Sequence, residues 1–135
     1  MKQILVEKAK EAMKRAYAPY SGFCVGAALL CRDGSIYTGC NIENASFSPT
    51  VCAERTAFFK AVEDGKREFS AIAVCGGKDG ELSGKFCYPC GVCRQVMNEF
   101  CDRDFKIYVM SENDVKEYTL AEILPFGFGA EDVGK

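Results

Sequence analysis

The run from residue 69 to residue 110 decides the expected fold. It contains FSAIAVC at 69–75, GVCRQVMNEFC at 91–101 and FKIYVM at 105–110. The first segment has alternating and then continuous apolar residues, as in a strand, and the last is also expected to be a strand. The middle segment is expected to be a helix. Strand–helix–strand alternation of this kind is typical of an α/β sheet with parallel strands.

The rest of the chain adds a hairpin and further helices around this unit. The expected elements are a helix at 2–17, strands at 25–31 and 35–40, a helix at 51–64, a strand at 117–120 and a helical turn at 121–124. Asp33-Gly34 is a hairpin turn signal, and Gly76-Gly77 is expected to end the strand before it. We therefore predict one α/β domain over residues 1–135, with a mixed five-stranded sheet sandwiched by helices.

Charge and hydropathy exclude several classes of protein. The net charge is −2 and the sequence pI is about 5.3, with no basic stripe of the kind that grips a nucleic-acid backbone. No apolar run approaches the roughly 18 residues that a membrane span needs. The first residues, MKQILVEK, become charged too early for a signal peptide. We expect a cytoplasmic protein that binds neither nucleic acid nor a membrane.

Cysteine use points to a metal. The chain has nine cysteines and no histidine. An odd number without a secretion signal argues against a disulfide framework and favours reduced thiols. Five of them are expected in the core as small hydrophobes, namely Cys24, Cys31, Cys40, Cys75 and Cys101.

Two helix starts carry the residues that could bind this metal. Cys52-Ala53-Glu54 begins one predicted helix, and Pro89-Cys90-Gly91-Val92-Cys93 begins another. Cys52, Cys90 and Cys93 could give a zinc ion three thiolate ligands and leave its fourth position open, as in catalytic sites. Helix N-termini lower thiol pKa values and suit thiolates. Because three thiolates leave the site negative, Arg55 is expected to donate hydrogen bonds to them.

Other interpretations of these cysteines remain open. Cys90 and Cys93 could form a redox pair or half of a structural zinc ribbon, and Cys87 could be a fourth ligand that closes the site. Glu54 alone would be an ordinary first-turn acid. Beside Cys52, in a chain without histidine, it becomes the only well-placed general base.

Together these motifs resemble the zinc-dependent nucleoside deaminases, and in particular the small homotetrameric cytidine deaminases with an all-cysteine zinc site. The similarity runs over nearly the whole chain. It rests on PYSGF at 19–23 with VGAA at 25–28, NIEN at 41–44, CAER at 52–55, PCGVCRQ at 89–95 and LPFGFG at 124–129.

The resemblance implies a reaction and its cofactor. One zinc ion per subunit, held by Cys52, Cys90 and Cys93, would activate a water molecule, and Glu54 would carry the protons. The expected activity is hydrolytic deamination of free cytidine and deoxycytidine to uridine and deoxyuridine, as in pyrimidine salvage. The substrate would be a small nucleoside rather than a polynucleotide.

The resemblance also implies substrate-binding residues. Asn41 and Glu43 would bind the ribose 3′-hydroxyl, Phe23 would stack near the pyrimidine, and Ala53 would offer backbone groups to the base. Phe128 would reach into a neighbouring subunit's site in a homotetramer. Two rivals remain: a deaminase of an aminocytosine antibiotic, similar to blasticidin deaminase, and a non-catalytic zinc or thiol-redox module.

Overall fold

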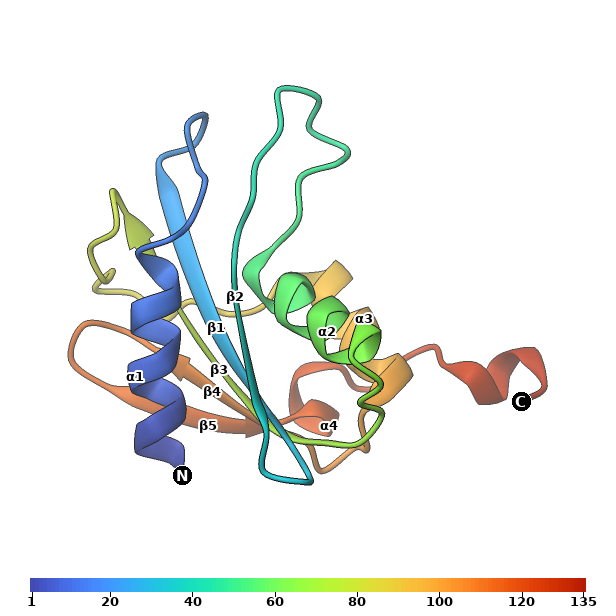
Figure 1. Cartoon of the computed structure of the whole chain (residues 1–135). Helices are drawn as coiled ribbons and strands as arrows, with labels where there is room; N and C mark the ends of the chain where they lie inside the picture. The colour runs from blue at the N-terminus through green and yellow to red at the C-terminus, as the bar shows by residue number, and fades with distance from the viewer.

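The computed structural model describes residues 1–135 and has one mixed sheet with helices on both faces (Figure 1). Its strands are β1 Phe23–Cys31, β2 Ile36–Cys40, β3 Phe69–Lys78, β4 Lys106–Met110 and β5 Val115–Thr119. Its helices are α1 Lys2–Met13, α2 Ala53–Glu63, α3 Gly91–Phe100, α4 Leu120–Ile123 and a 3₁₀ turn at Ala130–Val133. None of these helices combines the length and the apolar character that a membrane span requires.

The sheet has the order β2-β1-β3-β4-β5. Only β3 and β4 pair in parallel, and α3 connects them, whereas the other neighbours are antiparallel. Gly34 turns the β1–β2 hairpin with a φ of +93°, a conformation that glycine adopts without strain. The prediction of a mixed five-stranded α/β sheet between helices is therefore confirmed.

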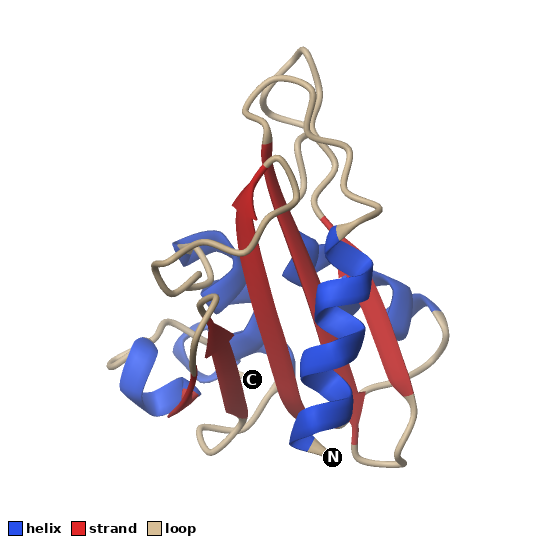
Figure 2. Cartoon of the chain, turned by 90° about the vertical axis from the view of Figure 1, so that its left-hand side faces the viewer, coloured by secondary structure: helices blue, strands red, loops and turns tan.

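Two apolar clusters hold the layers together. Along β1, Ala27 and Leu29 belong to the cluster under α2 and α3, whereas Ala28 faces α1, as the two-residue period of a strand requires. Phe58 of α2 and Met97 of α3 are fully buried in the first cluster. Figure 2 shows α1 lying across the near face of the sheet. The α2 and α3 helices thus share one face, where their N-termini can meet.

The helix at 2–17 was predicted too long, because α1 ends at Met13. Its helical spacing continues to Ala16, but the backbone of Tyr17 is used elsewhere. The Tyr17 N–H donates to the Asn41 carbonyl at 3.0 Å, and the Tyr17 carbonyl accepts from Glu43 at 2.8 Å. A long-range strand-like bridge thus competes with the helix for this residue and ends it early.

The prediction that Gly76-Gly77 ends a strand was wrong, since β3 continues to Lys78. Gly76 and Gly77 pair with Val25 and Cys24 of β1. A Cβ atom at Gly77 would lie 1.7 Å from the Glu81 carbonyl oxygen, so the following loop folds closely over this strand. Glycine is needed here for close backbone approach, not for a turn. The other element boundaries differ from the predicted ones by one or two residues.

Candidate metal centre

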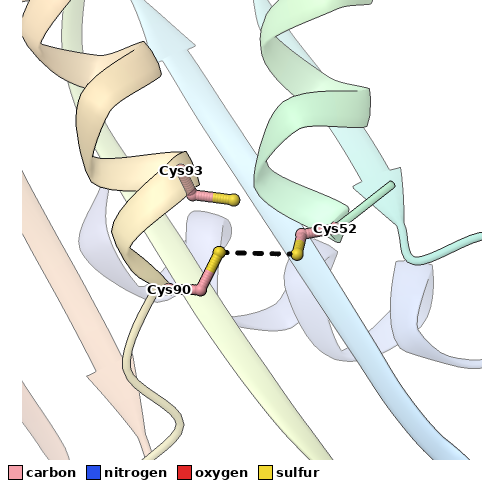
Figure 3. Close-up of side chains that lie close together, drawn as sticks. All are labelled: Cys52, Cys90 and Cys93. Atoms are coloured by element: carbon pink, nitrogen blue, oxygen red, sulfur yellow. Dashed lines mark hydrogen bonds between the residues drawn. The ribbon is translucent and has the colours of Figure 1, made fainter. Parts of the chain in front are cut away.

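Two helix N-termini meet on one face of the sheet and carry the three cysteines. Cys52 is the N-cap of α2 and Cys90 the N-cap of α3, both in an extended backbone conformation, and Cys93 lies in the first turn of α3. Free N–H groups and the positive end of each helix dipole surround these positions. Figure 3 shows the three side chains directed toward one another.

The sulfur atoms have the spacing of a metal site. All three lie within 4.8 Å of one another, and the Sγ atoms of Cys52 and Cys90 are 3.7 Å apart (Figure 3). Two sulfurs bound to one tetrahedral zinc at about 2.3 Å each would be about 3.8 Å apart. Soft thiolate donors in this arrangement also suit zinc chemically. The residues present therefore fit a zinc ion.

Arg55 lies beside the thiols, as the sequence predicted. One of its Nη atoms donates to Cys52 Sγ at 3.4 Å. The pKa of Cys52 is lowered to about 5, mainly by a hydrogen bond with Cys93 and further by Arg55 and Cys90. The pKa of Cys93, which shares that hydrogen bond, is raised. The Nε of Arg55 is buried without a hydrogen-bond partner. Positive charge is thus concentrated next to Cys52.

Glu54 occupies the first turn of α2, next to Cys52, and is only 3% exposed. Its Oε1 atom is buried and has no hydrogen-bond partner. Such atoms are rare in folded proteins, because burying a polar group without a partner is costly. Burial raises the pKa of Glu54 to about 7. A carboxyl group of this kind can both take and return a proton near neutral pH.

Cys87 is not part of the sulfur cluster, so the alternative of a site closed by this residue has no support. Its thiol packs instead against Gly76, where an added Cβ would come within 2.9 Å of the sulfur. Burial, together with a smaller contribution from the Glu54 carboxylate, raises the pKa of Cys87 to about 12. Cys87 is therefore a neutral thiol near the metal centre.

Of the five cysteines expected in the core, Cys31 and Cys75 are buried, whereas Cys24 and Cys101 are only partly buried against it. The prediction was wrong for Cys40, which belongs to neither cluster. Its thiol donates to the Arg15 carbonyl at the edge of the sheet, at 3.4 Å.

Phe23 begins β1 on the same face as the metal centre. An added Cβ at Gly76 would lie 3.1 Å from the Phe23 ring and 2.9 Å from the Cys87 sulfur, so ring and thiol meet above this glycine. Phe23 remains 39% exposed. Phe23 thus keeps part of its apolar surface free at the start of β1.

Asn41 and Glu43, which follow β2, bind the chain at the start of β1 and just before it. The Asn41 amide accepts from the Val25 N–H and donates to the Phe23 carbonyl, each at 2.8 Å. One Glu43 oxygen accepts from the N–H groups of Tyr20 and Ser21 at 2.9 and 3.1 Å, and the other accepts a short hydrogen bond from the Ser21 hydroxyl. Ser21 holds the carboxylate in place, a contact over 22 residues that no local sequence pattern signals.

Ala53 and Phe128 complete the predicted site residues. Ala53 is fully buried in the first turn of α2, and its carbonyl lies so near β2 that a Cβ at Gly39 would come within 2.4 Å of it. Phe128 lies in the C-terminal segment and is 61% exposed. The ring of Phe128 is therefore available to contact another molecule.

The chain matches a known protein family over most of its length. Residues 1–109 match the family described as the cytidine and deoxycytidylate deaminase zinc-binding region. This span contains the three cysteines, Glu54 and the Asn41–Glu43 segment.

Individual proteins are similar over almost their whole length. A cytidine deaminase of Sporosarcina psychrophila is 52% identical over 130 residues, which cover 96% of this chain and 92% of the relative. One of Halalkalibacterium halodurans is 49% identical over 133 residues, covering 98% and 97%. The crystal structure of cytidine deaminase from Burkholderia pseudomallei superposes with a TM-score of 0.88 at 44% identity, covering 95% of this chain and 99% of that one.

Proposed function

Because the chain belongs to the zinc-binding cytidine and deoxycytidylate deaminase family, we propose that the residues described above convert cytidine and water to uridine and ammonia. The chain is a zinc-dependent hydrolase that deaminates cytidine. The observation that carries the assignment of residues is the Glu54 carboxylate, which lies two residues after Cys52, is buried, and keeps its Oε1 atom without a hydrogen-bond partner.

Cys52, Cys90 and Cys93 would hold the zinc ion. When bound, zinc supplies a Lewis acid that makes a water molecule nucleophilic near neutral pH. Arg55 offsets the negative charge of the thiolates through its contact with Cys52. No fourth cysteine belongs to the cluster, which leaves one position for water and substrate.

Glu54 moves the protons of the reaction. Its carboxylate takes a proton from the attacking water and delivers it to N3 of the pyrimidine, which makes C4 electrophilic. It then takes the second proton of that oxygen and gives it to the amino group, which leaves as ammonia while the C4 carbonyl forms. Two protons leave the water and two reach the products, so one acid–base group suffices.

Asn41 and Glu43 would bind the sugar. After its two backbone hydrogen bonds, the Asn41 amide keeps one N–H and one lone pair, and the ionised Glu43 can still accept from a hydroxyl. Both would form hydrogen bonds with the 3′-hydroxyl, which ribose and deoxyribose share. We therefore expect deoxycytidine to react as well as cytidine.

Phe23 would stack near the base, and the Ala53 N–H would be available to it as a first-turn donor of α2. Phe128 would enter a neighbouring subunit's site in a homotetramer. Exposed aromatic residues support such an assembly: Phe47 is 78% exposed, Phe128 61%, and Phe126 fully exposed. All nine cysteines are free, which supports a cytoplasmic location where thiols stay reduced.

Zinc content and cytidine loss, measured on the same preparation, test this function. We expect about one zinc per chain and a fall in cytidine absorbance that stops after chelation and returns when zinc is added. Rapid turnover of blasticidin S in place of cytidine would favour the antibiotic deaminase instead. Stoichiometric zinc without deamination of either substrate would favour a non-catalytic module.

A further inference from the structure

The C-terminal segment that carries Phe128 includes a residue in the left-handed backbone conformation and packs closely against its neighbours. Phe126 has a φ of +56°, which is unusual for a residue with a side chain. A Cβ at Gly127 would lie 2.9 Å from Leu124 Cδ2 and 3.2 Å from Asn98 Nδ2. The segment therefore lies directly against α3, the helix that begins at the metal ligands Cys90 and Cys93.

Two amide side chains of α3 bind the backbone of Phe128. Gln95 Nε2 and Asn98 Nδ2 both donate to the Phe128 carbonyl, at 2.7 and 2.8 Å. These residues are three apart, so they share one face of the helix. A carbonyl oxygen has two lone pairs, and the two amides use both of them. The Phe128 backbone is fixed, while its ring stays largely exposed.

Arginine side chains complete the arrangement. Arg103 donates to Asn98 Oδ1 at 2.7 Å and to the Leu124 carbonyl at 2.5 Å. Because guanidinium only donates, this contact fixes the Asn98 amide with its NH₂ group toward Phe128. Arg94 bridges the Pro89 carbonyl, next to Cys90, and the Ile123 carbonyl, at 2.8 and 2.7 Å.

We propose that Gln95 and Asn98 are positioning residues that fix the direction of the Phe128 ring for nucleoside binding. This inference rests on the proposed function, in which Phe128 contacts the substrate. One helix then serves two purposes: its first turn supplies metal ligands, and its next two turns hold the aromatic residue for a neighbour's site. Losing the two amides frees the ring and weakens substrate binding without removing a ligand or a proton carrier.

The test is the double variant Gln95→Met/Asn98→Leu, which keeps side-chain bulk and removes both donors. We expect KM for cytidine to rise about threefold to tenfold, from the loss of one or two exposed hydrogen bonds, with kcat within about twofold. Zinc content and sedimentation should be unchanged. Hydrogen exchange at residues 124–129 should become faster. Replacing Gln95 by Lys instead of Met keeps a donor of similar reach at this position. The Gln95→Lys variant should therefore have a KM close to that of wild type.

A double-mutant cycle shows whether the two amides act through Phe128. Phe128→Ala alone should raise KM, and adding Gln95→Met/Asn98→Leu to it should change KM no further. The matched control is Gln3→Met, which removes an exposed amide donor from α1, where the Gln3 side chain donates to Glu7. It should leave KM unchanged.

Three results would overturn the proposal: an unchanged KM in the double variant, unchanged exchange at 124–129, or additive effects with Phe128→Ala. A wild-type chain that does not deaminate cytidine would contradict the proposed function, and the positioning role would fall with it. The wild-type assay therefore distinguishes the two failures.

Discussion

Glu54 and Glu43 are the two carboxylates of the proposed site, and the fold surrounds them in opposite ways. Glu54 is 3% exposed and keeps one oxygen without a partner. Glu43 is half-buried and accepts three hydrogen bonds from Tyr20 and Ser21. The pKa is raised for the first by burial and lowered for the second, mainly by the Ser21 hydroxyl. The unsatisfied group is suited to carrying protons, and the satisfied one to staying ionised and oriented.

The largest effect is expected when Glu54, the proposed proton carrier, is replaced. Glu54→Gln should lower kcat by roughly 10²- to 10⁴-fold, because the amide cannot exchange protons with water or substrate. Zinc content should stay at about one per chain, since the three thiols are intact. The melting temperature should not fall, because an amide is less costly to bury than a carboxylate. Steady-state kinetics, metal analysis and thermal unfolding measure these three quantities.

Glu43→Gln is the matched control, since it makes the same chemical change at the other carboxylate. It should affect KM more than kcat and leave zinc in place. If kcat of Glu54→Gln stayed near the wild-type value, or if both variants lost kcat equally, the division of roles between the two carboxylates would be contradicted.

A second effect, on zinc affinity, is expected at Arg55, which follows Glu54 in α2. Arg55→Ala removes the donor to Cys52 Sγ and leaves the thiolate charge unbalanced. We expect zinc affinity to fall by about 10- to 100-fold. Competition with a chromogenic chelator measures it. Arg32→Ala, which breaks exposed ion pairs with Glu68 and Asp102, is the control and should not change zinc affinity. Equal zinc affinity in Arg55→Ala and wild type would contradict this role.

The proposed site has a metal side, formed by the three cysteines with Glu54 and Arg55, and a sugar side around Asn41 and Glu43. The two sides differ in how far the sequence predicts them. The metal side follows from local rules: cysteines at the starts of two helices, with Glu54 and Arg55 one turn in, are visible as motifs. The same rules predicted the β3–α3–β4 unit and the sheet. Helical spacing is what brings Cys90 and Cys93 to one face, so little tertiary information is needed.

The sugar side depends on contacts that are distant in sequence. Ser21 and Glu43 meet beside the bridge that Tyr17, beyond the end of α1, forms with the segment at 41–43. The predicted helix at 2–17 hid this bridge, and the expected strand end at Gly76-Gly77 hid the place where Phe23 and Cys87 meet. Tertiary pairing overrides local propensity at both points.

A third, smaller effect should come from the hydroxyl that orients Glu43. Ser21→Ala removes one of three hydrogen bonds to the carboxylate, so KM should rise about threefold to tenfold with little change in kcat. The Glu43 pKa should move back up toward its usual range, since the Ser21 hydroxyl is the main cause of its lowering. In wild type, Glu43 supports the fold above its unfolded-state pKa, and this support is lost as pH falls through the lower folded-state pKa.

The acid side of the KM profile in Ser21→Ala should therefore shift to higher pH. Ser35→Ala, which removes a similar hydroxyl contact to Asp33 in the β1–β2 turn, should leave the KM profile unchanged. A Ser21→Ala profile that overlays wild type would show that Glu43 does not need this hydroxyl.

The smallest effect is expected at Cys87, a thiol near the metal centre but outside the sulfur cluster. Cys87→Ala should keep about one zinc per chain and change kcat/KM by no more than about twofold, because its neutral thiol only fills space beside Gly76 and Phe23. Cys90→Ala is the matched comparison and should lose zinc and activity together. If Cys87→Ala also lost zinc, the site would be closed by a fourth sulfur. No position would then remain for water beside Glu54, and the contrast between the two carboxylates would lose its chemical basis.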